Sequence, residues 1–120
     1  MRIIIVRPGE APEAKDIEPT LENFQNIVGG HFEACYPFKE QAVLVCNEEG
    51  KYREDFGWNR ALYHPETGEI MDIVRGPFFI CGLGEEDFTG LTPELEETLM
   101  KRFEKPEEFV MTARGIKVIR

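Results

Sequence analysis

The apolar residues of this chain come in short runs, and that limits its possible folds more than any other feature. Runs such as Ile3–Val6 and Pro77–Cys81 are far below the ~20 apolar residues that a membrane-spanning helix needs. Short runs rich in β-branched or aromatic residues, ended by glycine or proline, are typical of buried strands. The sequence therefore predicts a sheet with a buried core, and no membrane partner.

Several segments extend this sheet. Residues 2–6 predict a buried strand, and residues 31–36 and 42–46 predict two strands that form a hairpin if they pair. Residues 70–81 predict a further strand that reaches Cys81. Between them, residues 51–69 are irregular and predict a flap or hairpin over the sheet.

Two helices are predicted from capping signals. Thr20 precedes an apolar stripe at helical spacing, and Gly29 and Gly30 end it because glycine adopts the left-handed cap conformation without strain. Thr92 and Pro93 begin a second helix that runs to about residue 103. The predicted fold class is α+β, with one mixed or antiparallel sheet, two helices and an irregular central flap.

The length of 120 residues suits one domain. We expect a cytoplasmic protein, because an odd count of three cysteines is unlike the paired sets of small secreted domains. Neither sheet order nor oligomeric state can be derived from the sequence.

The three cysteines and His31 raise the question of a metal site. His31 and Cys35 share a face if they lie in a strand, but they are then about 13 Å apart, too far to hold one ion as a local pair. Cys35 and Cys46 become neighbours if their strands pair. We expect no cofactor, because buried thiols commonly act as small apolar groups. A zinc site drawn from His31, Cys35, Cys46 and Cys81 is the alternative.

Enzymatic chemistry finds little support in the sequence. The chain has no serine, which excludes a serine nucleophile. The segment "GLGEED" lacks the lysine of a phosphate-binding loop and places three acids where phosphate would bind. We therefore expect no catalytic residue and a protein that acts by binding.

The net charge of −9 argues against direct binding to nucleic acid, which needs lysine and arginine for its phosphates. An acidic surface can instead meet a basic protein surface. The residues expected to contact such a partner are exposed acids, with an aromatic residue and an arginine as anchors: Glu48, Glu49, Trp58, Arg60, Glu85, Glu86 and Asp87. The alternative is a pocket for a small molecule or nucleotide signal, lined by Arg53, Trp58 or Arg60.

Four stretches in order resemble a known family: "TLENFQNIVGGHFEA", "AVLVCNEEGKYREDFGWNRAL", "IVRGPFFICG" and "GEEDFTGLTPELEETLMKRF". They are similar to a small family of domains of unknown function that occurs in phages and conjugative elements. The resemblance covers residues 1–104. Residues 105–120 form an extension, predicted as a strand or hairpin packed on the same domain.

This resemblance brings no catalytic residue with it, but it implies a context. Small acidic proteins of mobile elements often block host defence proteins, and CRISPR nucleases present basic channels for nucleic acid. The resulting expectation is a non-enzymatic inhibitor, for example an anti-CRISPR protein, that binds a host defence protein. A replication accessory protein is a further alternative.

Overall fold

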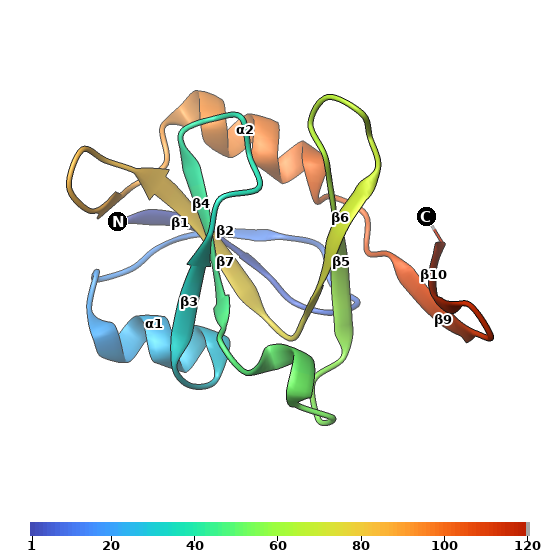
Figure 1. The fold of residues 1–120 in the computed structure, drawn as a ribbon. Coiled ribbons are helices and arrows are strands. Elements are labelled where there is room, and N and C mark those ends of the chain that lie inside the picture. The colour runs from blue at the N-terminus through green and yellow to red at the C-terminus, as the bar shows by residue number, and fades with distance from the viewer. Residues whose placement is uncertain (120) are drawn as a thin grey trace.

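The computed structural model describes residues 1–119, in which the strands build one main antiparallel sheet and two separate hairpins (Figure 1). The order across the main sheet is β2-β1-β7-β4-β3, and β8 pairs with β7. The α+β prediction is confirmed. The strands are β1 (Arg2–Val6), β2 (Glu13–Asp16), β3 (Phe32–Cys35), β4 (Ala42–Asn47), β5 (Trp58–Tyr63), β6 (Ile70–Arg75), β7 (Phe78–Leu83), β8 (Phe88–Thr89), β9 (Glu108–Thr112) and β10 (Gly115–Ile119). The helices are α1 (Leu21–Val28), α2 (Pro93–Arg102) and the short 3-10 helix η1 (Gly50–Tyr52).

The central strands β1, β7 and β4 are buried on both faces, which explains their continuous apolar runs. Successive side chains of a strand point to opposite faces, and the core accordingly divides into two clusters. Ile3 and Ile5 pack on one side of β1, whereas Ile4 and Val6 pack on the other. The same alternation separates Phe79 from Phe78 on β7.

Helix α1 covers the first of these faces, here called the α1 face. The Thr20 side chain accepts a hydrogen bond of 3.1 Å from the Asn23 amide, and Gly29 ends the helix with φ 79°. Phe24 and Val28 point into the cluster that contains Phe79. The predicted cap and stop are confirmed, but the apolar stripe is buried only from Phe24 onward, because Leu21 at its start is 62% exposed.

Helix α2 covers the opposite face, here called the α2 face. Thr92 accepts from the Leu95 amide at 3.2 Å and Pro93 opens the helix, as predicted. Leu99 and Phe103 are buried against the sheet. The two helices therefore stabilise opposite sides of the sheet.

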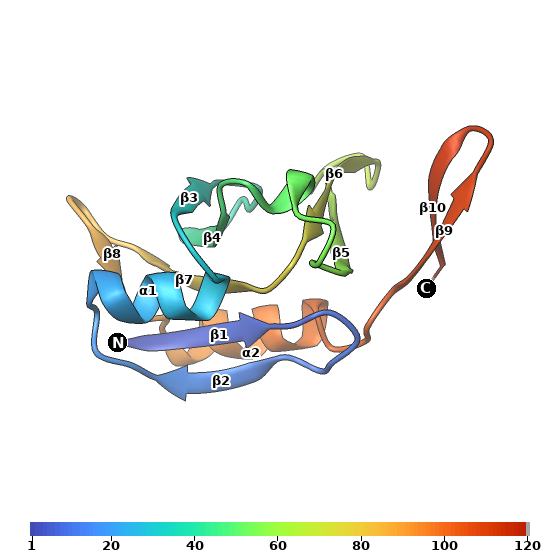
Figure 2. The same ribbon diagram turned by 90° about the horizontal axis from the view of Figure 1, so that it is seen from below.

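The middle of the chain is more regular than expected. β5 and β6 form a separate hairpin (Figure 2). Its residues Leu62 and Val74 join the core cluster of the α2 face. The predicted single strand over residues 70–81 is two strands. Gly76, at φ 85°, turns the chain between β6 and β7, which belong to different sheets.

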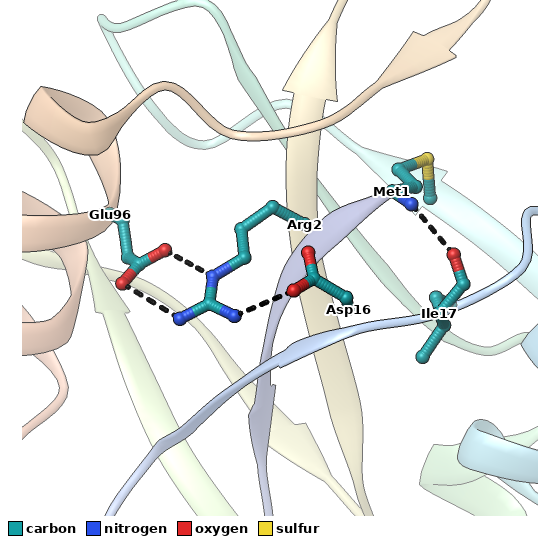
Figure 3. A network of polar contacts seen from close by, with 5 residues as sticks. All are labelled: Met1, Arg2, Asp16, Ile17 and Glu96. Atoms are coloured by element: carbon teal, nitrogen blue, oxygen red, sulfur yellow. Dashed lines mark hydrogen bonds and ion pairs between the residues drawn. The ribbon is translucent and has the colours of Figure 1, made fainter.

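Figure 3 shows how α2 is fastened to the sheet edge. The Arg2 guanidinium donates to both carboxylate oxygens of Glu96, at 2.6 and 3.3 Å, and to Asp16 at 3.1 Å. The amino group of Met1 donates to the Ile17 carbonyl at 2.7 Å. Arg2, on β1, thus joins the neighbouring strand β2 and the helix α2, whose Glu96 is 94 residues away in the sequence.

The extension forms a hairpin, β9–β10, in its described part, but most of this hairpin is exposed rather than packed on the domain as predicted; Arg120 lies outside the described residues. Both ribbon views show this hairpin standing away from the sheet (Figures 1 and 2). Phe109 contacts Trp58, with ring centroids 6.4 Å apart. Among residues 1–119, no helix has the length and apolar character to cross a membrane.

Candidate functional site

A cavity of about 620 Å³ opens on the α2 face, beside the last turn of α2. Three segments form its wall. They are the β3–β4 connection at residues 37–40, the β5 strand with its following turn at residues 60–68, and residues 101–107. This space is here called the basic cavity, for the charges described below. A second hollow of about 650 Å³ lies beside Arg2 and Leu91 and contains the Arg2–Glu96 ion pair.

Arg60 forms the inner wall of the basic cavity. β5 carries it into the interior, where it is 1% exposed. One terminal nitrogen donates to the Glu10 carbonyl at 2.7 Å and the Phe103 carbonyl at 3.0 Å. The other donates to the backbone and side-chain oxygens of Asn59, at 3.2 and 3.0 Å. Arg60 therefore ties the β1–β2 turn to β5 and the end of α2.

The Arg60 charge is only partly compensated. Its buried Nε has no hydrogen-bond partner within residues 1–119. Burial lowers the pKa of the guanidinium and the nearby Glu107 carboxylate raises it, and burial is the larger effect. The guanidinium remains a cation, since an arginine in a protein does not lose its proton.

The wall gathers positive charge in an acidic protein. It contains five of the 14 lysine and arginine residues but only three of the 23 aspartate and glutamate residues. Lys39 and Lys105 are exposed at the mouth, and none of the ion pairs found among the described residues includes either. Their ammonium groups are available to an anionic ligand.

The rest of the wall combines ion pairs with aromatic rings. Arg102 meets the Glu40 carboxylate at 2.6 and 3.1 Å and lies 5.9 Å from the Phe38 ring centre. The hydrogen bond from Arg102 lowers the pKa of Glu40. Glu107 accepts from the Ala61 amide at 2.9 Å and the Tyr63 hydroxyl at 2.7 Å. Flat apolar faces thus lie beside fixed charges.

Two of the four predicted zinc donors lie together elsewhere on the same face. β3 pairs with β4, as predicted, and the ligand atoms of Glu33, Cys35 and Cys46 all lie within 4.8 Å of one another. We call these three residues the thiol cluster. Cys81 packs against α1 on the other side of the sheet, and the side chain of His31 is exposed. The predicted set is therefore divided by the sheet.

The thiols differ in their environments. The hydrogen bond between Cys46 and Cys35 lowers the pKa of Cys35 and, together with burial, raises that of Cys46. Burial is the main cause that raises the pKa of Cys81 to about 12, and the charge of Asp87 raises it further. Cys81 is therefore a neutral apolar group at physiological pH.

The predicted partner residues do not form one surface. Glu48 and Glu49 follow β4, whereas Glu85, Glu86 and Asp87 follow β7, and all five are exposed. β4 and β7 are antiparallel, with Cys46 opposite Phe78 and Ala42 opposite Gly82. The two acidic groups consequently lie at opposite ends of a strand pair, separated by roughly 20 Å.

The predicted anchors are also dispersed. Arg60 is buried, so its place is in the cavity wall rather than on an outer surface. Trp58 is half-buried beneath Arg75, whose guanidinium lies 4.8 Å from the indole centre. Arg53 pairs with Asp55 at 2.7 Å and does not belong to the cavity wall.

The comparisons with known proteins give one match. The model of a family described as a domain of unknown function, DUF3846, matches residues 1–104. The chain belongs to the DUF3846 family. No curated protein and no solved structure shows a significant match to the chain.

The DUF3846 match gives the extent of the domain that the sequence motifs suggested, and it ends just after α2. The basic cavity crosses this boundary, because Lys105 and Glu107 belong to its wall. The hairpin β9–β10 lies outside the DUF3846 region.

Sequence reasoning named Arg60 but missed most of the cavity wall. Lys39, Arg102 and Lys105 come from segments that meet only in the folded chain. The "KRFEK" segment at residues 101–105 is one local signal, because its three cations gather at the C-terminal end of a helix that begins with acidic residues. Glu33 was missed because it becomes a neighbour of Cys46 only through the register of β3 on β4.

Proposed function

We propose that this protein is a non-enzymatic binding protein that holds a small phosphate-bearing molecule, of the nucleotide type, in the basic cavity. The observation that carries the proposal is the concentration of five basic side chains in one wall of a protein with net charge −9. Lysine and arginine are the residues that bind phosphate. A volume of about 620 Å³ is in the range of small-molecule sites.

The arrangement of the wall supports a ligand with an aromatic part. Phe38 and Tyr63 are half-buried, which leaves part of each ring accessible at the cavity. A nucleobase stacks on such rings, a contact worth about 1–3 kcal/mol. Lys39 and Lys105 would meet the phosphates, and Arg60 would contribute fixed positive charge from the inner wall.

The test is a calorimetric titration of the full chain with ATP, a cyclic dinucleotide and inorganic phosphate. The double variant K39Q/K105Q should weaken binding of the best probe at least tenfold. The control K15Q/K117Q removes two exposed lysines outside the cavity and changes the net charge equally. We expect the control to bind like the unmodified protein. Absence of binding by every probe, or equal loss in both variants, would overturn the proposal.

A second candidate is the inhibitor of a host defence protein, such as a CRISPR nuclease, in a phage or mobile-element setting. It is favoured by the two exposed acidic groups, Glu48–Glu49 and Glu85–Asp87, which suit a basic nucleic-acid channel. Because these groups lie at opposite ends of the sheet, they can be tested separately. The variants E48K/E49K and E85K/E86K would be assayed for rescue of phage growth in bacteria with single defence systems. A rescue by the unmodified protein that both variants retain would contradict electrostatic blocking.

A further inference from the structure

The thiol cluster brings three metal-binding groups to one place on the α2 face. Glu33 lies directly opposite Cys46 in the β3–β4 pair, and Cys35 lies opposite Leu44. Cys35 is thus the diagonal neighbour of Cys46 on the same face. The Cys46 sulfur is 3.9 Å from Oε1 of Glu33.

These distances suit a bound ion. Bonds of about 2.3 Å to sulfur and 2.0 Å to oxygen place the ligand atoms of a tetrahedral zinc ion about 3.5–3.8 Å apart. The three ligand atoms are already within 4.8 Å of one another, so closing on an ion needs about an ångström of side-chain movement. β3 is the edge strand of the sheet, and both of its donors retain solvent access. Side chains on this edge can make that adjustment.

A disulfide is the competing product of two close thiols. Diagonal neighbours in an antiparallel pair have Cα atoms about 7–8 Å apart. A disulfide bridges Cα atoms at about 4.4–6.8 Å. Cys35 and Cys46 are diagonal neighbours, so an ion between them fits the backbone better than a covalent bridge.

The charges around the cluster also suit a dication. Two thiolates and a carboxylate exceed the charge of one dication by a single negative charge. Lys51 interacts electrostatically with both Glu33 and Cys35, and its ammonium nitrogen lies 2.7 Å from Oδ1 of Asp72. The Lys51–Asp72 ion pair beside the cluster adds no net charge, so the complex keeps one negative charge at the solvent-accessible edge strand. Such neighbouring groups tune a metal site.

From these observations we propose that Glu33, Cys35 and Cys46 bind a zinc ion, with the fourth tetrahedral position open to water. Thiolate donors select zinc over magnesium and calcium. Cys81 supplies an internal contrast, because it is a buried thiol on the opposite face and does not belong to this donor group. The site is independent of the function proposed for the basic cavity.

The experiment is a titration of the full, reduced chain with Co²⁺ and then with Zn²⁺ against a chromophoric chelator. We expect one equivalent of Co²⁺ to give a thiolate-to-metal charge-transfer band and the visible bands of a tetrahedral site, and Zn²⁺ to abolish both. C35A, which changes a half-exposed residue, and the near-isosteric E33Q should each weaken Zn²⁺ binding at least tenfold. C81A should leave it unchanged.

Three results would overturn the proposal. They are the absence of the charge-transfer band, an equal loss of affinity in C81A, or a Cys35–Cys46 disulfide as the form purified without reductant. Circular dichroism of each variant would show that the fold is intact. Because C35A changes a half-exposed side chain, it tests the proposal even where a change at buried Cys46 disturbs folding.

Discussion

The two faces of the central sheet are built from alternate residues of the same strands, yet they differ in content. The α1 face is apolar throughout its buried cluster, with Phe24, Phe79 and the neutral thiol of Cys81. The α2 face has a comparable apolar cluster but also carries buried Arg60, the basic cavity and the thiol cluster. One face of the sheet thus serves stability, and the other combines stability with candidate binding sites.

The difference arises from what covers each face. A single amphipathic helix, α1, lies on the first face with Phe24 and Val28 buried. The second face is covered by α2 together with the β5–β6 hairpin, and these two units meet the β3–β4 connection at the basic cavity. Several covering elements leave a space between them, and the basic cavity lies in that space.

The largest loss of stability is expected at Phe79, which is fully buried on the α1 face. F79A should lower the free energy of unfolding by about 3–5 kcal/mol, because it removes a large buried ring. The milder F79L should remain folded and bind Zn²⁺ and nucleotide like the unmodified protein. Urea unfolding and calorimetry check both parts. A change of ligand affinity in F79L would show that the two faces are coupled.

The second prediction uses the pKa of Cys81. The folded state retains the thiol proton up to a pKa of about 12, whereas an unfolded thiol loses it near 8.5. The stabilisation that the protonated Cys81 thiol gives the folded state is therefore fully present below pH 8, and it is lost as the pH rises from about 8.5 toward 12. In that range the free energy of unfolding falls by up to about 1.4 kcal/mol per pH unit. C81A should flatten alkaline unfolding measured by urea titration, and an unchanged slope would contradict the assignment.

The third prediction compares the N-caps of the two helices. Thr20 and Thr92 each accept one hydrogen bond from a backbone amide, at 3.1 and 3.2 Å. T20A and T92A should therefore each cost about 1 kcal/mol of stability. Equal losses in chemical unfolding would show that the two faces contribute alike to the fold, although only one carries candidate sites. A loss in one variant alone would show that only one of the two caps stabilises the fold.

The smallest effect on stability is expected at the cavity mouth. R102Q breaks an ion pair with Glu40 in which the arginine side chain is 39% exposed, and such pairs contribute about 0.2–1 kcal/mol. The pair lowers the pKa of Glu40, so its contribution is present above the ordinary carboxyl pKa and is lost as the pH falls. Thermal unfolding at pH 7 and pH 3 measures this. Equal effects of R102Q at both values would contradict it.

Features specified by neighbouring residues were predictable from the sequence. Thr20 with Gly29 and Gly30, and Thr92 with Pro93, gave the limits of both helices. The strands on either side of residues 37–41 predicted the β3–β4 hairpin, which places Cys35 beside Cys46. The break at Gly76 was missed, because the apolar residues on both sides of it suggested one continuous strand.

Features specified by the folded chain were not predictable. The partners of Arg60 include Glu10 and Phe103, which are 50 and 43 residues away. The place of Glu33 in the thiol cluster depends on strand register, and a shift by one residue would turn it to the other face. Trp58 and Arg60 are two residues apart, but Trp58 packs against Phe109 of the C-terminal hairpin, whereas Arg60 lies in the cavity wall.

The contacts of Arg60 also determine when the basic cavity can form during synthesis. All strands of the main sheet are complete once Thr89 has been made, but one carbonyl bound by Arg60 belongs to Phe103. A nascent chain that stops before this residue lacks that acceptor and also Lys105, which follows α2. Truncated products of translation therefore have the strands of the sheet without the finished cavity, and only a chain that has passed Phe103 can bind the ligand proposed for it.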